Sequence, residues 1–379
     1  LYSSCAIIVF TTAALAGLML APSPGWATAP ITTFVIGAAA TTIPASLLMQ
    51  RVGRRPGFIL GAAACIVGAS LAAVAIFLGN FLLFCLATGL QGVFQAFGGY
   101  YRFAAVEASS EKMKPMAISW VLTGGVVAAV AGTLIASGTS DLFGPFTFAG
   151  SYAASSVIAI FAVLVLLFLK LPKPTIEETQ GERRPWSELL RQPRLIVAIA
   201  CATLAFGMMN LMMTAAPVAM IGCGFDKTDA SWVIQWHVLA MFVPSFFTGH
   251  LIVRYGVEKI CVAGMLLLIA AGITGLAGIT FGHFAVALIL LGLGWNFGFI
   301  GGTTMLTESY RPAERGKVQA ANDFAIAALM VVASLSSGKL LATVGWASVS
   351  IALFPMAAVA LVMIGWLVIQ QRTAASNIR

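Results

Sequence analysis

Long apolar stretches recur along almost the whole chain, separated by short polar segments. Each stretch is about as long as the roughly 20 residues that a helix needs to cross a bilayer. Twelve such stretches can be placed, at residues 3–21, 27–50, 57–78, 81–105, 115–138, 147–170, 194–221, 229–253, 259–280, 284–307, 317–341 and 346–370. The pattern predicts an all-α integral membrane protein with 12 transmembrane helices.

Composition and charge agree with this prediction. Of the 379 residues, 60% are hydrophobic and 9% are charged, whereas about a quarter of the residues in a soluble domain are charged. The net charge of +8 does not indicate a nucleic-acid partner, because the basic residues gather in alternate loops, as they do on the cytoplasmic side of membrane proteins. We therefore expect a multi-pass protein with both termini in the cytoplasm. Residues 1–21 are expected to be a genuine first span and not a cleaved signal.

The loop after the second apolar stretch carries a motif. The segment from Ser46 to Arg55 reads Ser-Leu-Leu-Met-Gln-Arg-Val-Gly-Arg-Arg, and residues 203 positions further on repeat it in part, with Arg254 for Arg51 and Gly256 for Gly53. Such a loop needs a tight glycine turn and holds arginines at the anionic inner surface. The repeat indicates that the two halves of the chain are equivalent.

This motif and the repeat resemble the Major Facilitator Superfamily. The resemblance implies two six-helix bundles, at residues 1–170 and 194–379, joined by a cytoplasmic linker at 171–193. It also implies a gating role for Arg51, Arg54 and Arg254. Ser46 and Gln50 replace the Gly and Asp of the family's pattern, so that the usual ion pair of this gate is lost here.

A histidine and several methionines lie inside predicted spans. Met209 and Met213 are four residues apart in the seventh stretch, and His237 and Met241 are four residues apart in the eighth. The two helices are antiparallel, so Met213 is level with His237, and Met209 is level with Met241 about one turn deeper. Thioether and imidazole groups are ligands for Cu(I). With 15 Met in the chain, the alternative is that these side chains only fill gaps in helix packing.

The pair of motifs, MxxxM followed by HxxxM, resembles the CcoA-type bacterial copper importers that feed cbb3-type cytochrome oxidase assembly. The resemblance implies that Met209, Met213, His237 and Met241 bind copper as the transported substrate of an inner-membrane importer. We expect no resident cofactor, a possible cytoplasmic copper chaperone as partner, and a monomer. Two cysteines, Cys223 at the outer mouth and Cys201 deeper in the same helix, form a weaker candidate relay.

The expected mechanism is alternating access of the two bundles around this midplane site. Asp323 lies within the eleventh stretch and either carries a coupling proton or ties helices together. A transporter of a small organic solute, such as a vitamin or drug, is the nearest alternative; Trp295 would then either contact the solute or pack. A membrane-bound copper sensor is a further alternative. An enzyme is not expected, because no catalytic motif is found.

Overall fold

The computed structural model describes residues 1–101, 104, 114–169, 184–311 and 314–376. Within these residues the chain is helical and contains no strand. In the described part of the chain, ten helices are each long and apolar enough to cross a membrane, and a bent pair of helices makes one more. The predicted all-α membrane fold is confirmed.

The twelve predicted stretches each correspond to a helix or to a pair of helices. The first six are α1 (Tyr2–Leu20), α2 (Ala29–Val52), α3 (Arg54–Phe77), α4 (Phe81–Gly98), α6 (Lys114–Gly138) and α7 (Ala149–Phe168). The second six are α9 (Pro193–Gly222), α10 (Lys227–Phe242) with α11 (Ser245–Tyr255), α12 (Val257–Ala277), α13 (Phe281–Thr307), α14 (Arg315–Val344), and α15 (Trp346–Ile351) with α16 (Leu353–Ser376). Two short helices, η1 (Pro24–Trp26) and α8 (Trp186–Leu189), lie between spans.

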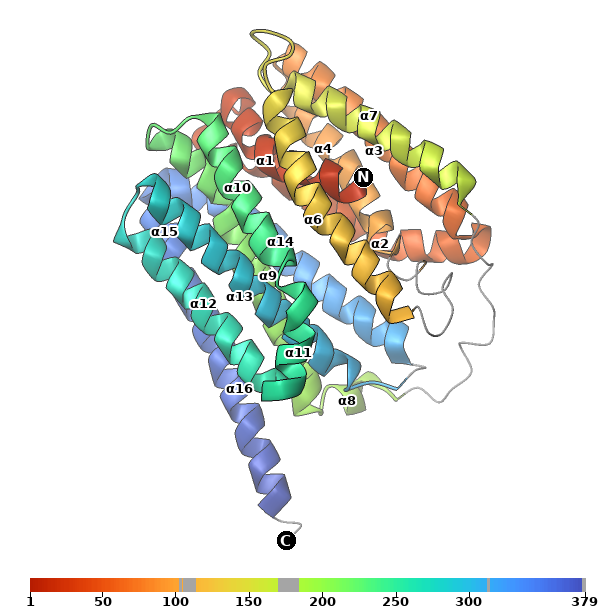
Figure 1. The fold of residues 1–379 in the computed structure, drawn as a ribbon, viewed down its shortest axis with the longest axis vertical. Coiled ribbons are helices and arrows are strands. Elements are labelled where there is room, and N and C mark those ends of the chain that lie inside the picture. The colour runs from red at the N-terminus through yellow and green to blue at the C-terminus, as the bar shows by residue number, and fades with distance from the viewer. Residues whose placement is uncertain (102–103, 105–113, 170–183, 312–313, 377–379) are drawn as a thin grey trace.

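The helices form two groups, which we call the first group (α1 to α7) and the second group (α9 to α16). In Figure 1 helices α3 and α7 lie on one side of the molecule, and α12 and α16 lie on the other. The largest core cluster belongs mainly to the second group, and two smaller clusters belong mainly to the first. The predicted domain boundaries at 170 and 194 stay a prediction, and most of the predicted linker, residues 171–183, lies outside the described residues.

The internal repeat is visible in the backbone. Gly53 separates α2 from α3 with φ 92° and ψ 161°, and Gly256 separates α11 from α12 with φ 91° and ψ 147°. Both conformations lie in the region that side chains other than that of glycine rarely adopt. The predicted glycine turn is therefore present in both halves.

The arginines of these two loops have different surroundings. The Arg54 guanidinium donates to the Tyr100 carbonyl at 3.5 Å, and the exposed Arg254 lies 5.2 Å from the centroid of the Tyr255 ring. The side chain of Arg51, in the last turn of α2, lies outside the described part of the chain. The gating roles of these three residues stay predictions.

Polar contacts join the two groups at the end of the molecule that carries η1, which we call the Trp26 end. The Thr32 hydroxyl donates to the Ser334 hydroxyl at 2.7 Å, and the Thr28 hydroxyl donates to the Ser334 carbonyl at 2.9 Å. Lys227 forms an ion pair with Asp141 across the same boundary. Because these contacts connect α2 with α14 and α10 with the loop after α6, they hold the Trp26 end closed.

A buried carboxylate fastens the end of the linker to the second group, at what we call the linker end. Glu314, fully buried before α14, accepts from the Arg184 side chain at 2.6 and 2.7 Å and from the backbone N–H groups of Arg184 and Arg311. The Lys317 ammonium donates to the Arg184 carbonyl at 3.2 Å and lies over the Trp186 ring. The Arg184 guanidinium holds the pKa of the Glu314 carboxyl well below its usual range.

Replacing Glu314 by Gln is expected to lower the unfolding temperature at pH 7 by a few degrees and to expose the Arg184 segment to protease. The reason is that an amide cannot match the charge of Arg184 and turns N–H groups toward donors. Since the pKa of Glu314 is depressed in the folded state, its stabilisation is present above the ordinary value of 4.5 and is lost as the pH falls below that value. Thermal unfolding measured at pH 7 and pH 4 should show the difference between wild type and Glu314→Gln shrinking at the lower pH. An unchanged difference would contradict this assignment.

Candidate functional site

His237 lies in α10 where this helix presses against α13. Its side chain is fully buried, and Nδ1 is 2.7 Å from the Leu288 carbonyl oxygen. Because a carbonyl only accepts, Nδ1 carries the hydrogen and donates, and in the neutral ring Nε2 keeps a free lone pair. Nε2 has no hydrogen-bond partner among the described residues. The close approach depends on Gly292, where a Cβ would lie 2.6 Å from the His237 carbonyl oxygen.

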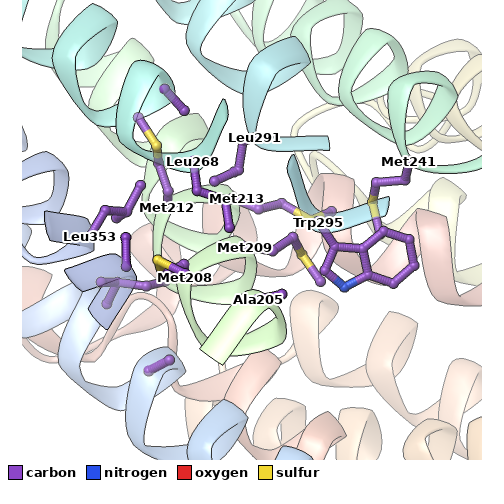
Figure 2. Close-up of a cluster of buried hydrophobic side chains, with 14 of the residues drawn as sticks. Ala205, Met208, Met209, Met212, Met213, Met241, Leu268, Leu291, Trp295 and Leu353 are labelled. Carbon is purple, nitrogen blue, oxygen red and sulfur yellow. The ribbon is translucent and has the colours of Figure 1, made fainter. Parts of the chain in front are cut away.

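The three methionines of the predicted ladder are buried in the core of the second group. Met209 and Met213 project from one side of α9, whereas Met208 and Met212 project from the other side toward Leu353 (Figure 2). In Figure 2 the Trp295 indole is drawn between Met209 and Met241. Met209, Met241 and Trp295 belong to the same core cluster, and methionine side chains are good gap-fillers in such a core.

The structure offers few other metal ligands. Among the residues it describes, no group of three or more His, Cys, Asp or Glu side chains is close enough to hold a metal ion. Cys201 is fully buried within α9, and Cys223 is exposed at the end of the same helix. The set of Met209, Met213, His237 and Met241 as one binding site stays a prediction from sequence.

Asp323 lies on the face of α14 that turns toward the first group. It is exposed, and its carboxylate accepts from the Asn322 side chain at 3.2 Å. Ser334 follows eleven residues later, which on an ideal helix is nearly the same face about 16 Å further along, and Ser334 bonds Thr32 of α2. The position fits a group between the two halves, whereas its role in proton coupling stays a prediction.

Four aromatic rings from three helices meet beside the methionines. We call Phe206 of α9, Phe242 of α10, and Trp295 and Phe299 of α13 the aromatic group. Trp295 and Phe299 are stacked, with centroids 5.1 Å apart and planes at 15°. Phe206 stands edge-on to both rings, at 5.0 and 4.8 Å, and Phe242 is 6.1 Å from Trp295.

A buried amide fixes the helices that carry this group. Asn296, next to Trp295, donates to the Met241 carbonyl and the Ser245 hydroxyl and accepts from Thr248, each at 2.7 Å. These partners flank the break between α10 and α11, where the two helices bend by 43°. Asn296 therefore supplies hydrogen bonds at a break in a membrane helix, where water is absent.

The sequence alone indicated Trp295, as a residue that either contacts an organic solute or packs. Phe206 and Phe242 were missed, because nothing in sequence links two residues 36 positions apart to a tryptophan still further on. One signal was present, namely the four-residue spacing of Trp295 and Phe299, which places both rings on one face of a helix.

Known relatives match nearly the whole chain. The riboflavin transporter RfnT of Brucella anthropi is 43% identical over 359 residues, which are 94% of this chain and 90% of the relative. Two uncharacterized MFS-type transporters of Bacillus subtilis, YdeG and YddS, are 28% and 27% identical over 90% and 85% of this chain and cover 83% and 78% of their own lengths.

The prediction of copper import is wrong. The relative that is 43% identical over 94% of this chain is a transporter of riboflavin, an organic vitamin. This favours the alternative of a small organic solute. The predicted copper chaperone and the predicted link to cytochrome oxidase assembly depended on copper import, so they lose their basis. The physical reason for the error is that methionine serves as a packing residue as readily as a ligand, and here Met209, Met213 and Met241 are all buried in the core cluster of the second group.

A match to one protein family covers the whole length of the chain. A sequence model of the Major Facilitator Superfamily matches residues 1–226 and 201–379. The helical fold, the repeated glycine turn and the transporter relatives agree with this match, and the chain is a multi-pass membrane transporter. The chain belongs to the Major Facilitator Superfamily.

Proposed function

We propose that this protein carries riboflavin, or a closely related flavin, across the bacterial cell membrane. The observation that carries the proposal is the 43% identity with a riboflavin transporter over 94% of this chain and 90% of that relative. The match extends over the residues inside the helix bundle as well as over the loops. It therefore bears on the binding site and not only on the fold.

The structure supports an organic solute with a flat ring. Riboflavin combines a planar tricyclic ring, which bears carbonyl groups, with a polyhydroxyl chain. The aromatic group of Phe206, Phe242, Trp295 and Phe299 offers flat apolar surface inside the helix bundle. Binding sites for small molecules are mostly lined by such apolar and aromatic side chains with few polar groups.

The transport cycle follows from the closed Trp26 end. We propose that the linker end faces the cytoplasm, because the loops at that end carry most of the basic residues. The contacts of Thr28 and Thr32 with Ser334 then close the outer side. Alternating access requires them to break when the site opens outward. Asp323, on the face of α14 toward the first group, is the proposed carrier of a coupling proton.

Bacteria that can neither make nor import riboflavin are expected to accumulate labelled riboflavin when they produce this protein. Their copper content, measured by mass spectrometry, should not change. The matched control is the same strain with the empty vector. A strain that makes folded protein in the membrane but takes up no more riboflavin than the control would contradict the proposed function.

A further inference from the structure

We propose that the aromatic group is the surface on which the planar ring of the substrate stacks, and that the Trp295 indole N–H donates a hydrogen bond to a ring carbonyl. The inference rests on the proposed function and adds to it the residues that recognise the flavin ring. It also predicts which part of the substrate each group contacts.

The stacked pair provides the right geometry. Trp295 and Phe299 lie with their planes at 15°, whereas the other aromatic pairs within the described residues are edge-on or tilted. Aromatic side chains prefer both offset-stacked and edge-to-face packing. In a stacked pair such as this one on successive turns of α13, the outer face of a ring lies parallel to the other ring, and a third planar ring can be added to the stack there.

The aromatic group lies at the boundary between the two helix groups. The Phe242 ring borders α6 of the first group, where a Cβ at Gly125 would lie 3.4 Å from it. Ile7 and Ala128, also of the first group, belong to the same core cluster as Trp295. The solute of a transporter of this architecture binds between the two halves near the middle of the membrane. The position therefore fits a substrate site.

Three rings of the group keep part of their surface uncovered. Phe206, Phe242 and Phe299 are each partly exposed although they lie within spans, and Trp295, whose ring contacts all three, is buried. A ring that packs only in the core of one helix group is covered on every side. Because these rings also lie at the boundary between the two helix groups, we assign their uncovered surface to an apolar ligand.

Three buried hydrogen-bonding groups without partners in the described part of the chain belong to the helices α9 and α13, which carry three of the four rings. The Trp295 indole N–H and the hydroxyls of Thr203 and Thr303 are buried and have no partner among the described residues. Thr203 precedes Phe206 by about one turn, and Thr303 follows Phe299 by about one turn, so both hydroxyls lie on the side of the linker end. Their helices touch at this level, where a Cβ at Gly302 would lie 2.9 Å from the Ala202 nitrogen.

Unmet buried donors are costly, and riboflavin supplies the missing partners. Its ring carbonyls can accept from the Trp295 N–H while the ring plane lies against the stacked pair. Its hydroxyl chain can then extend toward Thr203 and Thr303. The arrangement selects a planar fused ring with carbonyl acceptors and a polar tail, which is the chemical class of the flavins.

The chain contains a matched control for Trp295. Trp346 in α15 is also buried, its indole N–H also lacks a partner, and its ring contacts Phe284 at 4.9 Å. It lies near the Trp26 end: the preceding Gly345 donates to the Leu340 and Leu341 carbonyls of α14, and the Lys339 ammonium of the same helix is 5.8 Å from the Trp26 ring centroid. If burial and an unpaired N–H mattered only for folding, the two tryptophans would respond alike to substitution.

The test is quenching of riboflavin fluorescence by the purified protein in detergent, combined with uptake in cells. We expect Trp295→Leu and Phe206→Leu each to raise the dissociation constant roughly tenfold, since stacking of a planar ring on an aromatic side chain contributes about that much. Trp295→Phe keeps a ring but loses the donor and should weaken binding severalfold. Trp346→Phe should bind riboflavin as the wild type does. Size-exclusion profiles and unfolding temperatures show which variants are folded.

The outcomes separate the two proposals. If folded Trp295→Leu or Phe206→Leu bound riboflavin as strongly as the wild type, the stacking site would be overturned and riboflavin transport would still stand. If folded Trp295→Phe did so, the hydrogen bond from the indole N–H would be overturned. If Trp346→Phe weakened riboflavin binding as much as Trp295→Phe does, the loss would be an effect on folding, and this result would also overturn the site. A wild-type protein that neither binds nor takes up riboflavin would overturn the proposed function, and the stacking site with it.

Discussion

Oxidation of a Thr32→Cys/Ser334→Cys variant is expected to abolish riboflavin uptake, and reduction with dithiothreitol is expected to restore it. The two hydroxyls are 2.7 Å apart across the Trp26 end, so two sulfur atoms placed there are within reach of the S–S bond length of about 2.0 Å. The bond would fasten α2 to α14. Since alternating access needs this end to open, a covalent link should stop the cycle.

The chain offers a matched control for this cross-link. The hydroxyls of Ser70 and Ser156 are 3.0 Å apart, but they join α3 to α7 within the first group. A Ser70→Cys/Ser156→Cys variant should therefore keep its uptake after oxidation. Single-cysteine variants exclude effects of the exposed Cys223. Full uptake by a quantitatively cross-linked Thr32→Cys/Ser334→Cys variant would contradict the closed Trp26 end as an obligatory state.

Gly92→Ala is expected to cause a large loss of folded protein. Gly92 of α4 packs directly on the backbone of α2, and a Cβ there would overlap the Phe34 carbonyl oxygen and lie 2.8 Å from the Ala38 nitrogen. Both neighbours are backbone atoms within helices, so neither can swing aside. Overpacking of this kind costs about 1–3 kcal/mol or more. Thermal unfolding in detergent and the yield of monodisperse protein measure the effect.

Gly365→Ala in α16 is the matched control, because nothing lies within 4 Å of its added Cβ. It carries the same change in helix propensity, which favours Ala by about 0.5–1 kcal/mol. The two substitutions should therefore act in opposite directions. An unchanged unfolding temperature for Gly92→Ala would show that α2 and α4 separate more easily than their packing suggests.

The fold could be predicted from the sequence because a membrane imposes strong constraints. A spanning helix must be long and apolar, and charged residues must stay near the ends. The breaks in the eighth and twelfth stretches could not be placed. The first break, at Val243 and Pro244, is fixed by three hydrogen bonds with Asn296, which comes from another helix.

The repeat could also be predicted, because a turn of this conformation requires a glycine at a fixed position in the sequence. Gly53 and Gly256 have φ angles of 92° and 91°, and no other residue type adopts this conformation easily. The arginines that accompany them are less informative. A surface arginine can hold a neighbouring carbonyl, as Arg54 does, or lie over a ring, as Arg254 does, and the sequence does not distinguish these uses.

The binding site could not be predicted in the same way. Met209, Met213 and His237 have the spacing of ligands, yet spacing does not show what lies between them. In the structure Trp295, from a third helix, belongs to the same core cluster as Met209 and Met241. The rings of the aromatic group are 36 to 93 residues apart, measured from Phe206, so their contact depends on tertiary packing.

Riboflavin counterflow in liposomes that contain only the purified protein tests the central claim most directly. Liposomes preloaded with unlabelled riboflavin should accumulate labelled riboflavin from outside, and an excess of unlabelled riboflavin outside should block this exchange. Counterflow needs no knowledge of the coupling ion, because exchange alone drives it. The account predicts exchange above that of protein-free liposomes. Exchange no greater than in protein-free liposomes, by protein shown to be folded, would contradict it.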